Sequence, residues 1–422
     1  MHLIVTGGRV LDPAAGTDGP GEVWIADGRI VPADSFPRDD AETIDASGRL
    51  VAPALVDLHV HLREPGNDAA ETIASGTRAA AAGGFQAVVA MPNTTPPLDD
   101  PALVRFQIES ARAAGFADVV PSACLTRGRK GAEVADLDAL AAAGAGVFTD
   151  DGSTVMDDAV MREAMRRAAA LGLAVMDHAQ DHDAERRGVM HEGARSRALG
   201  LPGIPAGAET RIVERDIRLA RETGCRLHIQ HISGRDALEA VRRAAAEGVP
   251  VTAEVTPHHL VLCDDDIREP DPSYKMNPPL RSAADRQALE DAIVDGSITC
   301  LATDHAPHTA EAKARGFLHA PFGILGLETA VGVTWERLVR PGRMTPLEWL
   351  RRWTTGPAAV LRRPAPSLAP GVPANVAILD VDTEWTVDPS TFLSRSRNTP
   401  FAGWTLHARP AMTIHDGRVV GP

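Results

Sequence analysis

The chain has 422 residues, of which 44% are hydrophobic, 24% are charged and only 4% are aromatic. This composition excludes a disordered or collagen-like chain and is typical of a soluble globular protein. A total of 43 Lys and Arg against 57 Asp and Glu gives a formal net charge of −14. Such an acidic balance argues against a protein that binds nucleic-acid phosphates or an anionic membrane surface, so we expect small-molecule or protein partners.

The cysteines and the N-terminal residues indicate the compartment. Cys124, Cys225, Cys263 and Cys300 lie far apart in the chain, which favours a reduced cytoplasmic protein over a disulfide-stapled secreted one. The first residues lack a basic segment followed by an apolar run, and no stretch of about 18 apolar residues occurs. We therefore predict a cytoplasmic protein without a signal peptide or a membrane span.

The two ends of the chain share one sequence pattern, which is typical of short β-strands joined by turns. Residues 1–53 consist of short β-branched runs separated by Gly-containing turns, and residues 366–422 repeat this pattern. The segment IHDGRVV near the C-terminus echoes IADGRIV near the N-terminus. Chain termini commonly meet in space, so we predict that residues 1–53 and 366–422 form one small β-sandwich domain.

The middle of the chain, residues 54–365, alternates short apolar runs with alanine-rich helical stretches. Eight such runs can be counted, which predicts an α/β fold with a (β/α)8 TIM-type barrel. Most of the runs begin with apolar residues and end near His, Asp, Asn or Thr. Because catalytic groups of such barrels collect at the carboxyl ends of the strands, we expect the polar residues to share one rim.

Several of these strand ends carry side chains that bind metals. His59 and His61 are two residues apart, so on a strand both imidazoles point the same way. Imidazole and carboxylate ligands suit Zn²⁺ or a similar divalent ion. Four histidines and two carboxylates exceed the three protein ligands of one catalytic zinc, which favours two ions that share a carboxylate. The candidate ligands are His59, His61, Asp150 or Asp151, His178, His231 and Asp304.

Five segments carry a resemblance to a known family. DLHVHLREPG, FTDDG, HAQD, KMNPPLR and above all ATDHAPHTAEAK resemble the cyclic amidohydrolases, hydrolases of cyclic amide C–N bonds, and specifically the bacterial long-chain dihydroorotases. The resemblance covers essentially the whole chain. It implies one zinc held by His59, His61 and Asp304, a second held by His178 and His231, and a bridge between them made by Asp151 and a hydroxide.

Two questions concern the residue that would bridge the two ions: whether it is a lysine or an aspartate, and which aspartate it is. Hydantoinases, dihydropyrimidinases and allantoinases of this superfamily use a carboxylated lysine on the fourth strand, but here Lys130 and Lys275 have no lysine between them. The chain therefore resembles the aspartate-bridged dihydroorotases. Adjacent strand residues face opposite ways, so Asp150 remains an alternative to Asp151.

The resemblance also implies a reaction and a substrate site. The reaction is the reversible cyclisation of N-carbamoyl-L-aspartate to L-dihydroorotate plus water in pyrimidine biosynthesis, with Asp304 as general acid and base. An anionic substrate needs a fork-shaped cation, which Arg63 can supply. The resemblance adds further contacts: Asn93 and His308 to the substrate carboxylate, and Asn277, Phe322 and Gly323 to the ring.

Alternatives remain at both the molecular and the residue level. The chain could be another cyclic amidohydrolase, or a non-catalytic scaffold partner of aspartate transcarbamoylase; the resemblance also implies a homodimer and possible association with that enzyme. His258 and His259 are interpreted as structural or as hydrogen-bonding partners of ligands, and His305 as a non-ligand. Asp57 either orients a ligand or makes a plain strand-end hydrogen bond.

Overall fold

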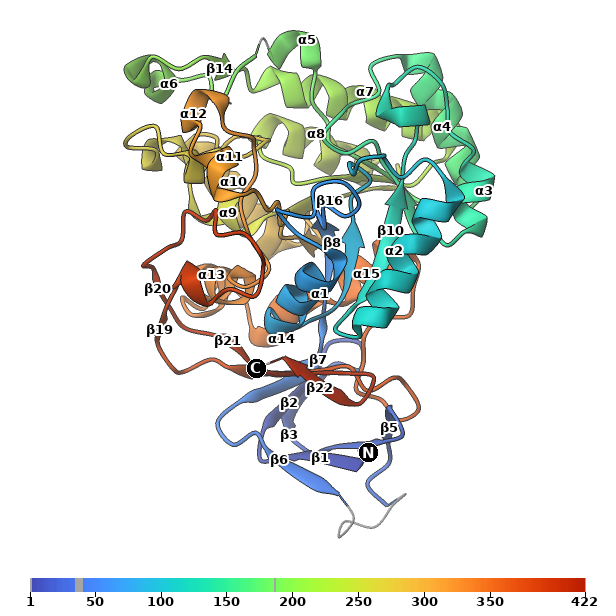
Figure 1. Cartoon of the computed structure of the whole chain (residues 1–422), viewed down its shortest axis with the longest axis vertical. Coiled ribbons are helices and arrows are strands. Elements are labelled where there is room, and N and C mark those ends of the chain that lie inside the picture. Colours follow the sequence, from blue (N-terminus) through green and yellow to red (C-terminus); the bar gives the residue numbers. More distant parts are fainter. Residues whose placement is uncertain (1, 35–40, 186, 422) are drawn as a thin grey trace.

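The computed structural model describes residues 2–34, 41–185 and 187–421. Eight strands form one parallel sheet, in which each strand lies beside its neighbour in chain order. A parallel bridge between Val60 and His305, with His61 N donating to His305 O at 2.8 Å, joins the two edges and closes the barrel. The predicted (β/α)8 barrel is therefore confirmed (Figure 1). Its strands are β8 (Leu55–Val60), β9 (Phe85–Ala90), β10 (Asp118–Ala123), β11 (Val147–Phe148), β12 (Val175–Asp177), β15 (Leu227–Ile229), β16 (Val251–Val255) and β17 (Cys300–Leu301).

Helices surround this barrel and bury their apolar faces against it (Figure 1). Helix boundaries follow local signals: Asp100 caps α2 by accepting from Ala102 N, Pro101 occupies its first turn, and Gly115 ends it at φ 72°. The larger helices are α1 (Ile73–Ala82), α2 (Pro101–Ala114), α3 (Leu137–Ala142), α4 (Asp158–Ala170), α7 (Gly207–Thr223), α8 (Arg235–Ala246), α10 (Ala283–Asp295), α14 (Pro346–Trp353) and α15 (Thr355–Leu361). Shorter ones are α5 (His182–Glu185), α6 (Ala194–Leu199), α9 (Pro257–Val261), α11 (Ala310–Lys313), α12 (Gly316–His319) and α13 (Ala330–Thr334).

Both chain ends contribute to the terminal sheets, as predicted. A six-stranded sheet has the order β22-β21-β18-β7-β2-β3, and a four-stranded sheet has the order β5-β4-β1-β6. The strands from the first 53 residues are β1 (His2–Thr6), β2 (Arg9–Asp12), β3 (Thr17–Pro20), β4 (Val23–Ala26), β5 (Arg29–Val31), β6 (Glu42–Asp45) and β7 (Leu50–Pro53). Those from the C-terminal end are β18 (Val376–Asp380), β21 (Arg409–His415) and β22 (Arg418–Gly421). β18 pairs antiparallel with β7, and the two sheets share one apolar core.

The repeated sequence motif of the two ends becomes a repeated turn. Asp27 and Gly28 join β4 to β5, and Asp416 and Gly417 join β21 to β22, all four with positive φ. Positive φ at both central residues is the requirement of a type I′ hairpin turn, which Asp-Gly meets. The two turns touch, because a Cβ on Gly417 would lie 2.7 Å from the Gly28 Cα.

The segment between β18 and β21 leaves the terminal sheets and packs on the barrel. It contains the two-stranded pair β19 (Trp385–Thr386) and β20 (Thr405–Leu406), and its Phe392 and Phe401 share an apolar cluster with Met276 and Leu325. A second small pair, β13 (Met190–His191) and β14 (Gly203–Ile204), lies between β12 and α7. The division into residues 1–53, 54–365 and 366–422 stays a prediction. No helix of the described residues is long and apolar enough to cross a bilayer.

Candidate metal centre and active site

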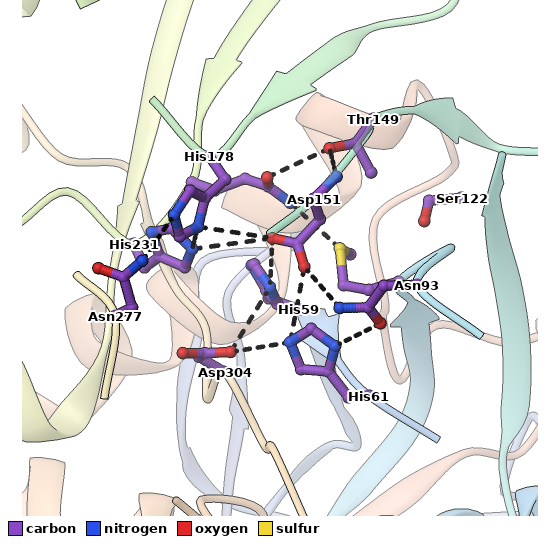
Figure 2. A network of polar contacts seen from close by, with 12 residues as sticks. His59, His61, Asn93, Ser122, Thr149, Asp151, His178, His231, Asn277 and Asp304 are labelled. Carbon is purple, nitrogen blue, oxygen red and sulfur yellow. Dashed lines mark hydrogen bonds and ion pairs between the residues drawn. The ribbon is translucent and has the colours of Figure 1, made fainter. Parts of the chain in front are cut away.

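Five barrel strands and the segments that follow them bring the predicted ligands together at one rim. His59 lies on β8 and His61 just beyond it, whereas Asp151, His178 and His231 follow β11, β12 and β15. Two groups of potential ligand atoms form there: His59, His61 and Asp151, and Asp151, His178 and His231, with the atoms of each group within 4.8 Å of one another. Asp151 belongs to both groups and lies at the centre of the network (Figure 2).

The Asp151 carboxylate faces all four imidazoles. Its Oδ1 is 3.3 Å from His59 Nε2, 3.9 Å from His178 Nδ1 and 3.8 Å from His231 Nε2. Its Oδ2 is 3.7 Å from His61 Nε2. The carboxylate therefore has the position that a bridge between two ions requires.

Asp304 lies beside the first pair of imidazoles. Its Oδ1 is 3.1 Å from His61 Nε2 and 3.6 Å from His59 Nε2. Its backbone has φ 48°, and the site residues Arg63 and His231 also have positive φ, 63° and 30°. Non-glycine residues rarely adopt this region, and such outliers cluster at functional sites.

The protonation pattern of His59 and His61 suits metal binding. His59 Nδ1 is 2.9 Å from Glu254 Oε1, and His61 Nδ1 is 2.9 Å from Asn93 Oδ1. Because a carboxylate and an amide oxygen only accept, both Nδ1 atoms carry the hydrogen. In the neutral form of each ring, the lone pair of Nε2 then points toward the carboxylates of Asp151 and Asp304, which is the tautomer that a histidine ligand with an oriented ring needs.

Two buried polar atoms of the cluster have no hydrogen-bond partner. His59 Nε2 and Asp151 Oδ1 are both buried and unpaired among the described residues, although such groups are almost always satisfied in folded proteins. His178 Nδ1 and His231 Nε2 face each other at 3.0 Å. A cation between these atoms would satisfy all of them, so the donor set fits a metal site.

The pKa values of the cluster indicate an excess of negative charge. Burial would raise the pKa of Asp151, but the nearby His59 and His231 imidazoles hold it well below its usual value. Burial would lower the pKa of His59, but the Asp151 carboxylate and the bond to Glu254 raise it well above normal. Burial and the nearby His231 lower the pKa of His178 to about 3. An ionised Asp151 carboxylate beside a neutral His178 imidazole is the protonation state that a metal ion requires of its ligands.

The structure separates the two adjacent aspartates that the sequence left open. The Asp150 carboxylate points away from the imidazoles and accepts from Thr126 N at 3.1 Å and from the Thr126 hydroxyl. It therefore holds the loop after β10. Of these two adjacent aspartates, Asp151 is the one that presents its carboxylate to the histidines.

Glu254 on β16 is a residue that the sequence analysis missed. It is fully buried, and its Oε1 accepts from His59 Nδ1 and, at 3.3 Å, from His231 N. Its Oε2 is 3.0 Å from His228 Nε2. One carboxylate therefore contacts a residue from each ligand group. The available signal was a glutamate inside an otherwise apolar barrel strand, where buried carboxylates need a specific partner.

Asp57 takes a backbone role rather than orienting an imidazole. It accepts from His59 N at 3.1 Å and from Thr303 N at 3.0 Å, and also from the Thr303 hydroxyl. These bonds join β8 to the segment after β17, where the barrel closes. Asp57 thereby fixes the relative position of His59 and Asp304.

Three further histidines near the site are not in either ligand group. His259 contacts Thr256 Oγ1 at 2.8 Å and Pro278 O at 3.0 Å. His305 accepts from Gly326 N at 3.3 Å. Burial lowers the pKa of His258 to about 4, so this ring stays neutral. Hydrogen-bonding roles for His259 and His305 agree with their interpretation from sequence.

A cavity of about 180 Å³ opens beside this cluster of histidine and aspartate side chains. All six predicted substrate-binding residues line it together with five of the predicted ligands, while His59 lies buried beneath. Arg63 Nε donates to Pro307 O at 3.1 Å, and its Nη2 is 3.4 Å from His308 Nε2. His308 Nε2 donates to Phe322 O at 2.7 Å. The lining residues are His61, Arg63, Asn93, Asp151, Gly152, His178, His231, Asn277, Asp304, Ala306, His308, Phe322 and Gly323.

Two of the predicted substrate residues also contact ligand residues. The side-chain oxygen of Asn93, Oδ1, accepts a hydrogen bond from His61 Nδ1. The side-chain nitrogen of Asn93, Nδ2, is 3.4 Å from Asp151 Oδ2. Asn277 Nδ2 is 3.3 Å from His178 Nε2 (Figure 2). Both side chains therefore line the cavity and contact the candidate ligands.

Comparison with known proteins identifies the family. A family model described as dihydro-orotase-like matches residues 48–237. A dihydroorotase of Pelotomaculum thermopropionicum is 49% identical over 421 residues, which cover 100% of this chain and 98% of the relative. The chain belongs to the dihydroorotase family. A dihydroorotase of Solibacter usitatus, 45% identical over 99% of this chain and 97% of its own, is a second full-length relative.

Solved structures show that the architecture extends beyond the dihydroorotase family. An L-hydantoinase (dihydropyrimidinase) of Arthrobacter aurescens has a TM-score of 0.87 at 25% identity, covering 99% of this chain and 96% of its own. A dihydropyrimidinase of Brevibacillus agri has a TM-score of 0.85 at 22% identity, covering 100% of this chain and 95% of its own. The sequence similarity to dihydroorotases is about twice as high.

Proposed function

We propose that the protein is a dihydroorotase that interconverts N-carbamoyl-L-aspartate and L-dihydroorotate plus water in pyrimidine biosynthesis. The observation that carries this proposal is the joint placement of Arg63 and His308 in one cavity with the Asp151-centred cluster. A fork-shaped cation suits a carboxylate, and the cluster suits hydrolysis of an amide. The full-length relatives named dihydroorotase support the same reaction.

We propose two zinc ions as the resident metals. His59, His61 and Asp304 would hold one ion, His178 and His231 would hold the other, and Asp151 would bridge them together with a hydroxide. Imidazole and carboxylate ligands suit zinc. When bound, a pair of such ions polarises a carbonyl and makes a hydroxide available near neutral pH.

Asp304 is suited to move the proton. Burial would raise its pKa, but the hydrogen bond with His61 and the nearby His59 hold it well below its usual value. The carboxylate is therefore ionised at neutral pH and can accept a proton from the attacking water in ring opening, then deliver it to the departing ring nitrogen. In ring closure the transfers run in reverse.

The remaining cavity residues would bind and orient the substrate. Arg63 has its Nη2 beside His308, and burial lowers the pKa of Arg63 only to about 10, so the guanidinium stays charged. Arg63, Asn93 and His308 would bind the substrate carboxylate. Asn277 and the backbone of Phe322 and Gly323 would contact the ring.

A different cyclic amidohydrolase is the competing enzyme, because the structural neighbours carry hydantoinase and dihydropyrimidinase names. Hydantoins, dihydropyrimidines and allantoin lack the carboxylate of dihydroorotate, so the half-buried guanidinium of Arg63 in the cavity disfavours them. A non-catalytic scaffold is disfavoured because every candidate ligand position carries a residue able to bind metal.

We further propose a cytoplasmic homodimer that is able to associate with aspartate transcarbamoylase. The four cysteines are free and buried, which suits a reducing compartment. The dimer and the transcarbamoylase association rest on the family resemblance alone.

Steady-state assays of the zinc-supplemented protein test the proposed function. We expect turnover in both directions, with N-carbamoyl-L-aspartate and with L-dihydroorotate, and little turnover of hydantoin or allantoin. Rapid hydantoin or allantoin hydrolysis without dihydroorotate turnover would reject the proposal. A purified protein that binds no metal and turns over none of these substrates would favour the scaffold.

A further inference from the structure

The segment of residues 316–323, which we call the rim loop, forms one wall of the active-site cavity. Its last two residues, Phe322 and Gly323, line the cavity, and the Phe322 carbonyl accepts from His308 Nε2. At its other end the loop is open to solvent, since Leu318 is 47% exposed. The position of this wall therefore depends on what holds the loop from behind.

Two buried lysines hold it. Lys275 Nζ donates to Ala320 O at 2.7 Å and to Leu318 O at 3.2 Å. Lys313 Nζ donates to Pro321 O at 3.1 Å and, outside the loop, to Pro272 O at 2.9 Å. The two ammonium groups therefore bind three main-chain carbonyls of the rim loop, those of Leu318, Ala320 and Pro321.

The two lysines are also joined to each other. Lys313 Nζ lies 3.3 Å from Lys275 O, and the same carbonyl accepts from Gly323 N at 2.9 Å. Lys275 Nζ lies 4.6 Å from the centre of the Phe322 ring, within range of a cation–π contact. Phe322 and Gly323 are therefore fixed by the same pair of residues.

Neither ammonium group forms an ion pair within the described residues, although Lys275 is only 3% exposed and Lys313 only 9%. Buried charges without a counter-ion are costly and rare in folded proteins. Burial accordingly lowers the pKa of Lys275 to about 8, and burial together with Lys275 lowers that of Lys313 to about 7. Packing alone does not explain two buried ammonium groups that form no ion pair in the described part of the chain, which points to a functional role for them.

We propose that Lys275 and Lys313 are positioning residues that fasten the rim loop through its main-chain carbonyls and thereby hold Phe322 and Gly323 in place for the substrate. This inference deepens the proposed function and rests on it for the identity of the substrate. The tight fit at Gly323 agrees with it, because a Cβ there would lie 2.5 Å from the Ala306 Cβ. A small displacement of this wall is enough to impair binding.

The test compares Lys313→Met and Lys275→Met with Lys130→Met, which changes the remaining, exposed lysine. Methionine keeps the length of the side chain but removes the donors. We expect KM for dihydroorotate to rise about tenfold or more in the first two variants, with a smaller change in kcat. Zinc content should equal that of the wild type, and Lys130→Met should behave as the wild type.

Limited trypsin digestion supplies a readout that does not depend on the substrate. Arg315 is exposed and immediately precedes the rim loop. Cleavage of the chain after Arg315 can be followed by mass spectrometry of the fragments. We expect Lys313→Met to be cleaved there several-fold faster than Lys130→Met, and dihydroorotate to slow the cleavage in the wild type. If Lys313→Met does not fold, Lys275→Met decides in the same assay.

The outcomes separate the two proposals. A wild type that turns over dihydroorotate, with unchanged KM and cleavage rate in both lysine variants, overturns the role of the lysines and leaves the proposed function intact. A wild type without turnover rejects the proposed function, while faster cleavage in the variants still supports the fastening of the loop.

Discussion

At the residue scale, three of the candidate ligands are held in place by a second polar contact. Glu254 fixes His59 and the backbone of His231, and Asn93 fixes His61. Asp57 holds the backbone of His59 against Thr303. The geometry of the proposed metal centre therefore depends on buried residues that do not bind metal themselves.

The proton-transfer role of Asp304 predicts a specific defect. In Asp304→Asn, the side chain keeps its size and one oxygen but cannot take up a proton. We expect kcat for dihydroorotate to fall by about 10²- to 10⁴-fold while zinc remains partly bound. Steady-state kinetics with elemental zinc analysis measure this. Near-normal kcat in a zinc-containing variant would remove the assigned role.

Glu254 predicts a defect in metal affinity. In Glu254→Gln, the amide no longer bonds His59 as a charged acceptor, so we expect zinc affinity to fall by about 10- to 100-fold. Competition with a chelator measures the change, and Glu239→Gln on the exposed face of α8 is the matched control. Equal zinc affinity in both variants would show that Glu254 does not orient the ligands.

The residue types of this site were predictable from the sequence, but their supports were not. The ligands stand out because His and Asp follow apolar runs. Glu254 is a single glutamate within an apolar strand, and its partner His59 lies far away along the chain, so no local pattern identifies that partner. For the same reason sequence spacing could not choose between Asp150 and Asp151.

At the element scale, the barrel strands are shorter than the apolar segments that predict them. β11 and β17 have two residues each, and Asp151 and Asp304 lie beyond them in irregular backbone. The alternation rule for strands does not apply there. The sequence therefore predicts which strand each ligand follows, while the direction of each side chain depends on backbone angles such as the φ of 48° at Asp304.

The rim loop predicts a pH dependence of substrate binding. The charged groups that act on Lys313 are Lys275, Asp271 and Arg63, and burial is the main cause of its lowered pKa of about 7 against 10.5 for an unperturbed lysine. The ammonium is therefore lost as the pH rises through about 7, and that of Lys275, with a pKa of about 8, follows. We expect KM to rise between about pH 6 and pH 9.

The stability of the fold should increase over the pH range in which substrate binding weakens. Between the folded and unfolded pKa values of Lys313 the unfolded chain binds more protons, so this group makes the fold more stable as pH rises. We therefore expect the increase in KM without a loss of thermal stability from these lysines. A wild-type KM that follows the same pH profile as Lys313→Met would contradict the assignment.

At the scale of the whole molecule, the C-terminal part of the chain reaches back to the active site. Asn398 lies between β18 and β21; its Oδ1 accepts from His308 N at 3.1 Å, and its Nδ2 donates to Ala306 O at 3.0 Å and Gly323 O at 3.1 Å. The sequence predicted that both ends form one β module, because their turn motifs match. It did not predict this contact, because it joins residues about 90 positions apart.

Asn398 therefore predicts a binding defect that originates outside the predicted barrel range. We expect Asn398→Ala to raise KM for dihydroorotate several-fold, because His308 and Gly323 lose their common support, with zinc content unchanged. The matched control is Asn375→Ala, whose side chain bonds Gln86 on the barrel strand β9 and Asp416 N in the turn between β21 and β22. That variant should lower thermal stability and leave KM unchanged. Similar effects of both variants on KM would refute a local role for Asn398.

The most direct test of the account is the ratio of kcat/KM for L-dihydroorotate to that for dihydrouracil, which is the same ring without the carboxylate. A cavity that pairs Arg63 and His308 with that carboxylate predicts a ratio of at least about 10³, since a site built to bind a polar group strongly rejects the analogue that lacks it. A ratio near one, or a preference for dihydrouracil, would contradict the proposed dihydroorotase and favour a dihydropyrimidinase.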